Sequence, residues 1–468
     1  MNDAMPAALL IDDDLRRIFD HIERNEEAFV RRAMDYVRHP SISAQDIGIA
    51  DVGAMLLDML RQLGLEAEAI PTARHPMILG RWDKKPGAPT ILLYGHYDVQ
   101  PPEPLEAWDS PPFEPTIRDG RIYARGIGDN KGQHFAQLLA LESHLAATGT
   151  LPCNVAVLLE GEEEIGSPHI AEVVRAHRDK LKADLVVTAD GPLHESGRPI
   201  VTFGVRGVAS FELRARCADR DMHSGNFGGV APNAIWSLVH CLATMRNEAG
   251  EITIESLHDR VVPPTEAERQ AAAALPLDLD GTMAELGLTR LDAPPERPYY
   301  DRLMFHPTLT INGFHGGYGG PGSKTVLPRE AFAKCDIRLV EAMTVEDVFE
   351  KVAAHVRRHA PEVEFVPLNG MLPSKTPFDS PYAAPIREAV LAAQGVEPLL
   401  YPSMGGSLPD YVFTKILGVP AFVVPYANAD EANHAPNENL KLSCFINGIR
   451  TGAALLSRLA AMRPPAKA

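Results

Sequence analysis

The segment 91–100, ILLYGHYDVQ, constrains the fold more than any other stretch of the chain. It begins as a continuous apolar run, which is typical of a buried strand in the middle of a parallel sheet, and it ends in His96 and Asp98. Residues two apart on a strand face the same side, so these two side chains should project together. In open α/β sheets the ligand crevice lies outside the carboxyl ends of the strands. The segment therefore indicates either a metal or catalytic site, or a histidine that a nearby acid satisfies structurally.

The same pattern recurs along the chain. Four apolar runs are each followed by possible ligands: His96 and Asp98, Glu162–Glu164, Asp190, and His434. Asp129 lies in a glycine-flanked loop, RGIGDNKG, just before a predicted helix. Apolar strands that alternate with helices predict a mostly parallel sheet flanked by helices. Such a sheet would bring these strand ends to one edge.

A second kind of pattern interrupts this α/β organisation. Residues 209–216 and 331–339 alternate apolar with polar side chains, as half-exposed antiparallel strands do. The α/β pattern resumes after about Pro381. We therefore expect a catalytic domain formed by residues 1–205 and 381–468, interrupted by an inserted α+β domain over residues 206–380. A chain of 468 residues is long enough for two such domains.

Composition narrows the possible partners and the compartment. The formal net charge of −17 argues against nucleic acid or an anionic membrane as a partner. We identify no signal peptide and no membrane-spanning segment. The five cysteines are scattered and contain no CxxC pair, which favours reduced thiols in a cytoplasmic protein.

The possible ligands favour particular metals. Two histidines and several carboxylates without cysteine suit divalent zinc, manganese or cobalt. A pair of metals about 3.5–4 Å apart needs one bridging carboxylate and further ligands for each ion. Any single His or Asp of this set can equally be structural, and Glu162–Glu164 alone can be a solvated acidic turn. Their joint occurrence at successive strand ends favours the metal site.

With these motifs in place, the sequence resembles the cocatalytic-metal exopeptidases, which include carnosinases, cytosolic non-specific dipeptidases, aminoacylases and glutamate carboxypeptidases. The motifs that carry the resemblance follow the family's order: GHYDV, GIGDNKG, EGEEEIGS, the strand end at Asp190, MHSGNFGG and NHAPNE. MHSG and a long excursion in the inserted domain are most similar to the carnosinase and dipeptidase branch. The resemblance implies that the inserted domain serves as lid and dimer surface.

The resemblance also implies a role for each site residue. His96 and Asp190 would bind one metal, and Glu164 and His434 would complete the other. Asp129 would bridge both metals. The peptide bond between Asp129 and Asn130 would be cis. Asp98 would orient His96, and Glu163 would be the general base. Three consecutive glutamates occupy this motif, so the assignment of Glu163 and Glu164 depends on Gly161 before them and Gly166 after them.

The inserted domain would supply the substrate contacts. In the dipeptidase branch the residue equivalent to His223 reaches the site from the partner subunit, which implies a homodimer. Arg338, in the segment DIRLV, resembles the residue that grips the substrate carboxylate. Gly406 and Ser407, in the segment MGGS, would add further contacts.

The expected function is hydrolysis of the amide bond of dipeptides or similar small substrates with a free carboxylate. A metal-bound hydroxide would attack, with two divalent ions per chain, Zn²⁺ ahead of Mn²⁺ or Co²⁺. Two alternatives stay open. One is an N-acyl amino acid deacylase or desuccinylase with the same metal chemistry, and the other is a catalytically inactive binding protein of the same fold.

Overall fold

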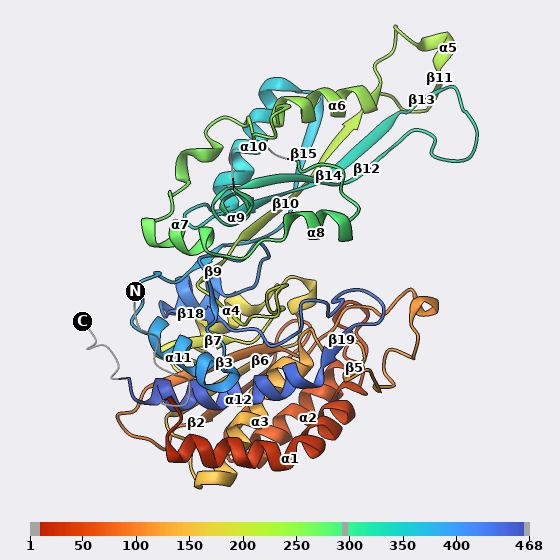
Figure 1. The fold of residues 1–468 in the computed structure, drawn as a ribbon. Coiled ribbons are helices and arrows are strands. Elements are labelled where there is room, and N and C mark those ends of the chain that lie inside the picture. The colour runs from red at the N-terminus through yellow and green to blue at the C-terminus, as the bar shows by residue number, and fades with distance from the viewer. Residues whose placement is uncertain (1–9, 293–297, 463–468) are drawn as a thin grey trace. The chain divides into compact units, whose positions relative to one another are not determined.

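A computed structural model describes residues 10–292 and 298–462 of the chain. The described residues group into two compact units, which Figure 1 shows as ribbons. The first unit combines the described parts of residues 1–204, 375–402 and 412–468. The second combines the described parts of residues 205–374 with residues 403–411.

The first unit is built on an eight-stranded sheet with the strand order β1-β2-β6-β3-β7-β18-β8-β17. The strands of this sheet are β1 (Glu66–Ile70), β2 (Met77–Trp82), β3 (Thr90–His96), β6 (Asn154–Glu160), β7 (Leu185–Thr188), β8 (Ile200–Thr202), β17 (Leu399–Tyr401) and β18 (Ala421–Val423). Strands β6, β3, β7 and β18 run parallel to one another, whereas β2 is antiparallel to both of its neighbours, β1 and β6. All of β6 and nearly all of β3 are buried, which explains why these segments are continuous apolar runs in the sequence.

Helices cover both faces of this sheet. They are α1 (Asp13–Val37), α2 (Ile49–Gln62), α3 (Lys131–Thr148), α4 (Ile170–Ala176), α11 (Ala383–Gln394) and α12 (Leu442–Ala460). Figure 1 shows α1, α2 and α12 on one side of the sheet and α4 on the other. In α1, buried side chains recur at helical spacing, and Asp12 caps the helix by accepting a hydrogen bond from the backbone N–H of Leu15. The apolar stripe of α1 thereby joins the core of the first unit.

Shorter elements complete the first unit. They are the three-stranded sheet β19-β5-β4, formed by β4 (Thr116–Arg118), β5 (Arg121–Tyr123) and β19 (Asn439–Lys441), the 3-10 turns η2 (Ser43–Gln45), η3 (Leu105–Ala107) and η4 (Glu163–Ile165), and the π-helix η6 (Val412–Leu417).

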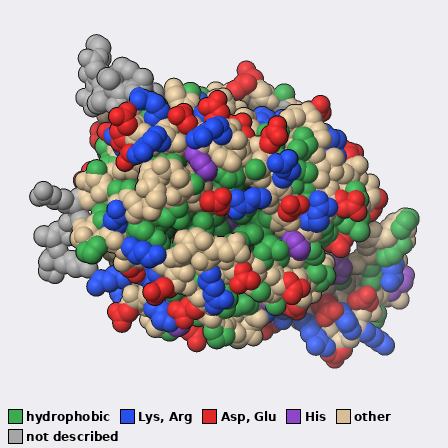
Figure 2. Space-filling view, turned by 90° about the horizontal axis from the view of Figure 1, so that it is seen from below, with side chains coloured by type: hydrophobic (Ala, Val, Ile, Leu, Met, Phe, Trp, Pro, Cys, Tyr) green, Lys and Arg blue, Asp and Glu red, His purple; other side chains and the backbone are tan. Residues whose placement is uncertain are grey.

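Acidic and basic side chains are interspersed over the face in Figure 2. Among the described residues, no helix is long and apolar enough to span a membrane.

The second unit is organised around a four-stranded antiparallel sheet with the order β12-β14-β10-β15. Its strands are β10 (Gly207–Arg216), β12 (Thr308–Gly316), β14 (Glu330–Leu339) and β15 (Val363–Met371). The other elements are β11 (Met222–His223), β13 (Val326–Leu327), α5 (Ser224–Phe227), α6 (Ala234–Met245), η5 (Leu257–Arg260), α7 (Glu266–Ala273), α8 (Leu279–Glu285), α9 (Tyr299–Phe305) and α10 (Val345–His359). Alternate side chains of β10 and β14 face α6 and α10 and form a separate core.

The expected fold class is confirmed, since a mostly parallel sheet flanked by helices is interrupted in sequence by an α+β unit. Two of the points at which the chain passes between the units lie in short strands, β9 (Gly204–Val205) and β16 (Ser374–Lys375), whereas the expected boundaries are at 205/206 and 380/381. Residues 403–411 differ from expectation, because they group with the second unit. The backbone N–H of Arg206 donates to the carbonyl oxygens of Met404 and Gly406, which holds this segment there.

We predict that Leu93→Ala lowers the free energy of unfolding of the first unit by about 2–5 kcal/mol, because it leaves a cavity in the middle of β3. Leu105→Ala is the matched control, since the Leu105 side chain is exposed on η3 and should change stability by less than about 0.5 kcal/mol. Denaturant unfolding followed by fluorescence measures both. Equal effects of the two substitutions would contradict the placement of Leu93 in the core.

Candidate metal centre

The parallel pairing of three strands brings the predicted ligands to one edge of the sheet. His96 is paired with Glu160 of β6, and Tyr94 is paired with Thr188 of β7. The three strands therefore end at nearly the same level. The segments that follow them carry Asp98, Glu162–Glu164 and Asp190, so these residues emerge together, as the sequence pattern predicts.

One carboxylate lies between two histidines. Asp129 Oδ1 is 3.0 Å from His96 Nε2, and Asp129 Oδ2 is 3.1 Å from His434 Nε2. His96 Nε2 is also 3.5 Å from Asp190 Oδ2, and His434 Nε2 is 3.1 Å from Glu164 Oε2. The five side chains therefore form two three-residue clusters that share Asp129, and in each cluster one ligand atom per residue lies within 4.8 Å of the others.

Asp98 positions its neighbours without entering either cluster. Its carboxylate accepts hydrogen bonds from the backbone N–H groups of Glu163 (3.2 Å) and Glu164 (3.0 Å). Its backbone oxygen lies 3.0 Å and its Oδ1 3.4 Å from His96 Nδ1. A proton on Nδ1 satisfies both acceptors, so the lone pair of Nε2 points toward Asp129 and Asp190.

The three consecutive glutamates have different surroundings. Glu162 is buried and its carboxylate accepts hydrogen bonds from the backbone N–H of His75 (2.7 Å) and the hydroxyl of Thr72 (2.8 Å), and it pairs with His169 (2.6 Å). It is thus fully engaged away from the clusters. Glu164 belongs to the cluster of His434, and Glu163 precedes it on η4.

Glu438, which the sequence reasoning did not single out, holds the loop that carries Asp129. Its Oε1 accepts from the backbone N–H groups of Gly128 (2.9 Å) and Asp129 (3.0 Å), and its Oε2 accepts from Gly126 N–H (2.9 Å) and Arg125 Nη1 (2.8 Å). The Asp129–Asn130 peptide bond is cis, as expected. The signal for Glu438 was its place in the NHAPNE motif, four residues after His434.

Gln133, at the start of α3, joins three of the segments around the site. Its side-chain N–H group donates to the carbonyl oxygens of Gly128 (2.8 Å) and Gly191 (3.1 Å), and its Oε1 accepts from the backbone N–H of Tyr426 (2.7 Å). The loops of Asp129 and Asp190 are therefore tied to the segment that follows β18. Sequence reasoning missed this residue because its partners are distant in the chain.

The centre carries an excess of buried negative charge. Burial and the charge of Asp129 raise the pKa of Glu164 to about 7. Burial also raises the pKa of Asp190 and of Glu163. Hydrogen bonds with Asp129 and Glu164 raise the pKa of His434 to about 11. The raised pKa values of Glu163, Glu164, Asp190 and His434 all indicate that positive charge, as a proton or a cation, is favoured here.

The donor set fits divalent metal ions. Two imidazoles and three carboxylates, without a thiolate, match the ligands of zinc, manganese and cobalt. Glu431 supports this fit, because both of its carboxylate oxygens are buried without a hydrogen-bond partner among the described residues. Burial and the charge of Asp129 raise the pKa of Glu431, so the ionised carboxylate lacks a compensating positive charge beside the clusters. Divalent cations would offset this charge.

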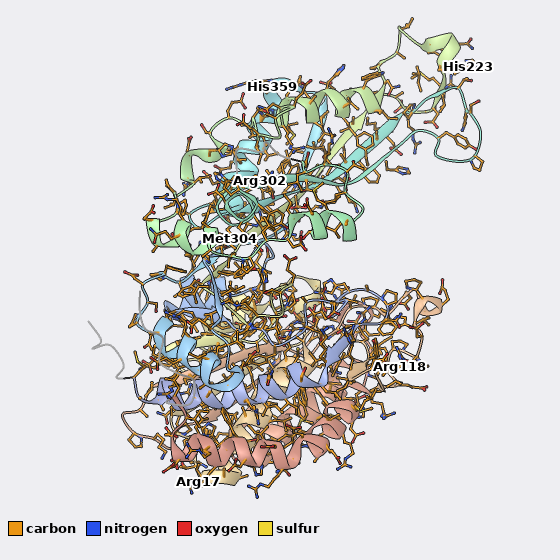
Figure 3. The ribbon with its side chains drawn as sticks, viewed as in Figure 1. Arg17, Arg118, His223, Arg302, Met304 and His359 are labelled. Atoms are coloured by element: carbon orange, nitrogen blue, oxygen red, sulfur yellow. The ribbon has the colours of Figure 1, made fainter. Side chains whose placement is uncertain are left out.

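The remaining predicted residues, His223, Arg338, Gly406 and Ser407, belong to the second unit. Figure 3 labels His223, which is exposed where β11 meets α5. Its Nδ1 accepts a hydrogen bond from the backbone N–H of Gly225 (3.0 Å), which places the ring proton on Nε2. Arg338 Nη1 donates to Ser407 Oγ at 2.8 Å, so the structure brings these two predicted residues together.

Arg206 is a cation near Arg338 that the sequence reasoning did not assign to the site. Its Nε donates to the carbonyl oxygen of Gly405 (2.9 Å). Burial and the nearby charge of Arg338 lower the pKa of Arg206 to about 10. Two neighbouring guanidinium groups repel each other, and a bound anion would relieve that repulsion. The sequence signal was weak, because a lone arginine between strands has many structural uses.

Comparison with known proteins places the chain in a family. Residues 92–458 match the model of peptidase family M20/M25/M40. The chain is 28% identical over 471 residues to the human protein named Beta-Ala-His dipeptidase, covering 95% of this chain and 93% of that protein. It is also 28% identical to the Schizosaccharomyces pombe protein named Cys-Gly metallodipeptidase dug1, covering 96% of this chain and 99% of that protein.

Solved structures share the fold over almost the full length. An M20 family metallo-carboxypeptidase from Sulfolobus solfataricus superposes with a TM-score of 0.88 at 32% identity, covering 93% of this chain and 99% of that one. Human carnosine dipeptidase 1 superposes with a TM-score of 0.82 at 28% identity, covering 96% of this chain and 99% of that one.

We predict that Glu438→Gln weakens divalent metal binding about 10–100-fold, as loss of a residue that supports metal ligands typically does. Glutamine would direct an N–H group at backbone donors that now share two carboxylate oxygens. Equilibrium dialysis against Zn²⁺ measures the effect. Glu142→Gln, at a surface pair with Arg32, is the control and should bind as the wild type does. Unchanged affinity of Glu438→Gln would remove Glu438 from this role.

Proposed function

The chain belongs to peptidase family M20/M25/M40, and from that premise we propose that it hydrolyses the amide bond of dipeptides with a free carboxylate. One observation carries the proposal: the two oxygens of Asp129 face two different histidines, each of which also faces a further carboxylate. This is the arrangement that a two-ion site requires. The names of the relatives, a Beta-Ala-His dipeptidase and a Cys-Gly metallodipeptidase, support the substrate class.

In the proposed site, His96 and Asp190 would hold one ion, Glu164 and His434 would hold the second, and Asp129 would serve both. Zn²⁺ is the favoured ion, with Mn²⁺ or Co²⁺ also suited to these ligands. The chemistry that such ions supply is Lewis acidity, which lowers the pKa of water and offsets the charge that develops on the amide oxygen.

The protein's own side chains then move the protons. Glu163 takes a proton from water onto its carboxylate and delivers it to the nitrogen of the leaving amine. Asp98 supports this step from two sides, because it accepts from the backbone N–H of Glu163 and faces Nδ1 of His96. The glutamate and the ligand histidine are thereby held by one buried carboxylate.

We predict that Glu163→Gln lowers kcat by at least about 100-fold and leaves the metal content unchanged, because glutamine cannot carry the proton. Turnover of a free dipeptide and metal analysis of the same preparation measure the two effects. Glu162→Gln is the neighbouring comparison, since its carboxylate is engaged by the Thr72–His75 segment; it should affect stability more than proton transfer. Full activity of Glu163→Gln would refute the assignment of the base.

A substrate carboxylate would be held by Arg338, with Ser407 and Gly406 beside it and Arg206 adding positive charge. We predict that Arg338→Ala lowers kcat/KM for free dipeptides by about 10–100-fold, which corresponds to one lost charged hydrogen-bonding group. Dipeptides with an amidated C-terminus should already be poor substrates and should lose little more. An equal loss for both substrate forms would contradict a carboxylate contact.

The deacylase alternative and the binding-protein alternative are separated by a small substrate panel tested after metal loading. The panel holds free dipeptides, the same dipeptides with amidated C-termini, and N-acetyl and N-succinyl amino acids. Cleavage of the free dipeptides supports the proposal. Cleavage of only the acylated amino acids favours the deacylase. No cleavage by a metal-loaded protein favours the binding protein.

The active form proposed here is a homodimer in which His223 serves the site of the partner subunit. The tautomer of His223 supports this role, because its Nε2–H can donate to a carbonyl oxygen as negative charge develops there. The exposed position of the residue also suits a contact beyond its own chain.

We predict that inactive His223→Ala and inactive Glu163→Gln chains regain activity when their subunits are exchanged. A mixed dimer would contain one site with both groups intact, so an equal mixture should recover about a quarter of the wild-type rate. Turnover after co-refolding measures this recovery. If His223 acts within its own chain, the mixture stays inactive.

The cysteines support the expected cytoplasmic location. All five lie in the described residues, where none forms a disulfide and four are buried. Burial raises the pKa of Cys153 to about 12 and that of Cys241 to about 11, so these thiols are poorly reactive. Reduced, buried thiols suit a reducing compartment.

A further inference from the structure

The second unit contains a cluster of possible metal ligands that the proposed reaction does not use: Glu255, His355 and His359. The two histidines are four residues apart on α10 and therefore lie on the same face of the helix. Glu255 comes from the segment just before η5. One ligand atom from each residue lies within 4.8 Å of the other two.

A hydrogen bond with Thr244 determines which ring nitrogen of His355 carries a proton. The Thr244 hydroxyl donates to the carbonyl oxygen of Cys241 (2.7 Å), so its oxygen accepts from His355 Nε2 (2.9 Å). Because Nε2 carries this proton, Nδ1 of the neutral ring presents a lone pair. That lone pair faces Glu255 Oε2 at 2.5 Å. A lone pair and a carboxylate oxygen this close repel each other unless a proton or a metal ion lies between them.

His359 meets the other oxygen of the same carboxylate, with Nε2 at 2.8 Å from Glu255 Oε1. Arg358 Nη1 is also 3.1 Å from this oxygen. If both histidines were protonated, three positive charges would surround one carboxylate. A single divalent ion between the three side chains would contact one ligand atom of each.

We propose that Glu255, His355 and His359 bind one divalent transition-metal ion at a site separate from the catalytic centre. Two imidazoles and one carboxylate are ligands for Zn²⁺, Co²⁺ or Ni²⁺ and are poorly suited to Ca²⁺ or Mg²⁺. Three protein ligands leave a position for water. The ion would tie the last turn of α10 to the segment before η5.

Exposure allows an ion to reach this site. The His355 side chain is 2% exposed and supplies a fixed ligand, whereas His359 is 34% and Glu255 is 43% exposed. Figure 3 labels His359 on α10. Arg358 is 69% exposed, so its side chain can turn into solvent when a cation binds.

The test is to dialyse the full-length protein against Zn²⁺ at neutral pH and to count zinc per chain. The wild type should bind one equivalent more than His359→Ala and one more than Glu255→Gln, which keeps the shape of the side chain and removes its charge. His240→Ala is the matched control, because His240 is an exposed histidine of α6 in the same unit. It should bind as much zinc as the wild type.

Equal zinc content in the wild type, His359→Ala and Glu255→Gln would overturn the proposal and leave a hydrogen-bonded cluster of protonated histidines. A loss shared by His240→Ala would also overturn it, since the zinc would then be bound without this site. The measured quantity is a difference between variants of one protein. The number of ions in the catalytic centre therefore cancels, and a failure of the proposed dipeptidase activity would not affect the result.

Discussion

The parallel pairing of β3 with β6 and β7 is the constraint on which the rest of the first unit depends. The pairs His96 with Glu160 and Tyr94 with Thr188 bring three strand ends to one level. The register of β3 is therefore fixed, because a shift of one residue would turn the His96 side chain to the opposite face of the sheet. The segments that follow can then carry acidic residues without disturbing the apolar sheet beneath them.

Buried negative charge is the second constraint, and the surrounding structure limits its cost. Backbone N–H groups converge on Glu438 and on Asp98, so each supporting carboxylate is stabilised by fixed dipoles. The carboxylates of the two clusters each have an oxygen that faces Nε2 of His96 or His434. This difference separates groups that shape the loops from groups that are suited to hold cations.

The second unit shows the same physical logic on a smaller scale. Glu255 faces two imidazoles of α10, just as Asp129 faces two imidazoles in the first unit. The surroundings differ, since Glu255 is near the surface and beside Arg358, whereas the Asp129 side chain is mostly buried. Weaker desolvation and a competing cation favour looser binding of a metal at Glu255 than in the candidate centre.

The sequence by itself determined the fold class and the interruption of one domain by another. It also determined the order of the motifs that carry the candidate ligands, His96, Asp129, Glu164, Asp190 and His434. Apolar periodicity and motif spacing suffice for this, because they are local properties of the chain. Only the tertiary structure decided which oxygen of Asp129 faces which histidine, that Glu162 is engaged elsewhere, and that residues 403–411 belong with the second unit. The roles of Glu438, Gln133 and the Glu255 cluster were likewise hidden, since their partners lie up to about 300 residues away in sequence. Hydrogen-bond geometry between distant segments is fixed by packing, which local patterns do not encode.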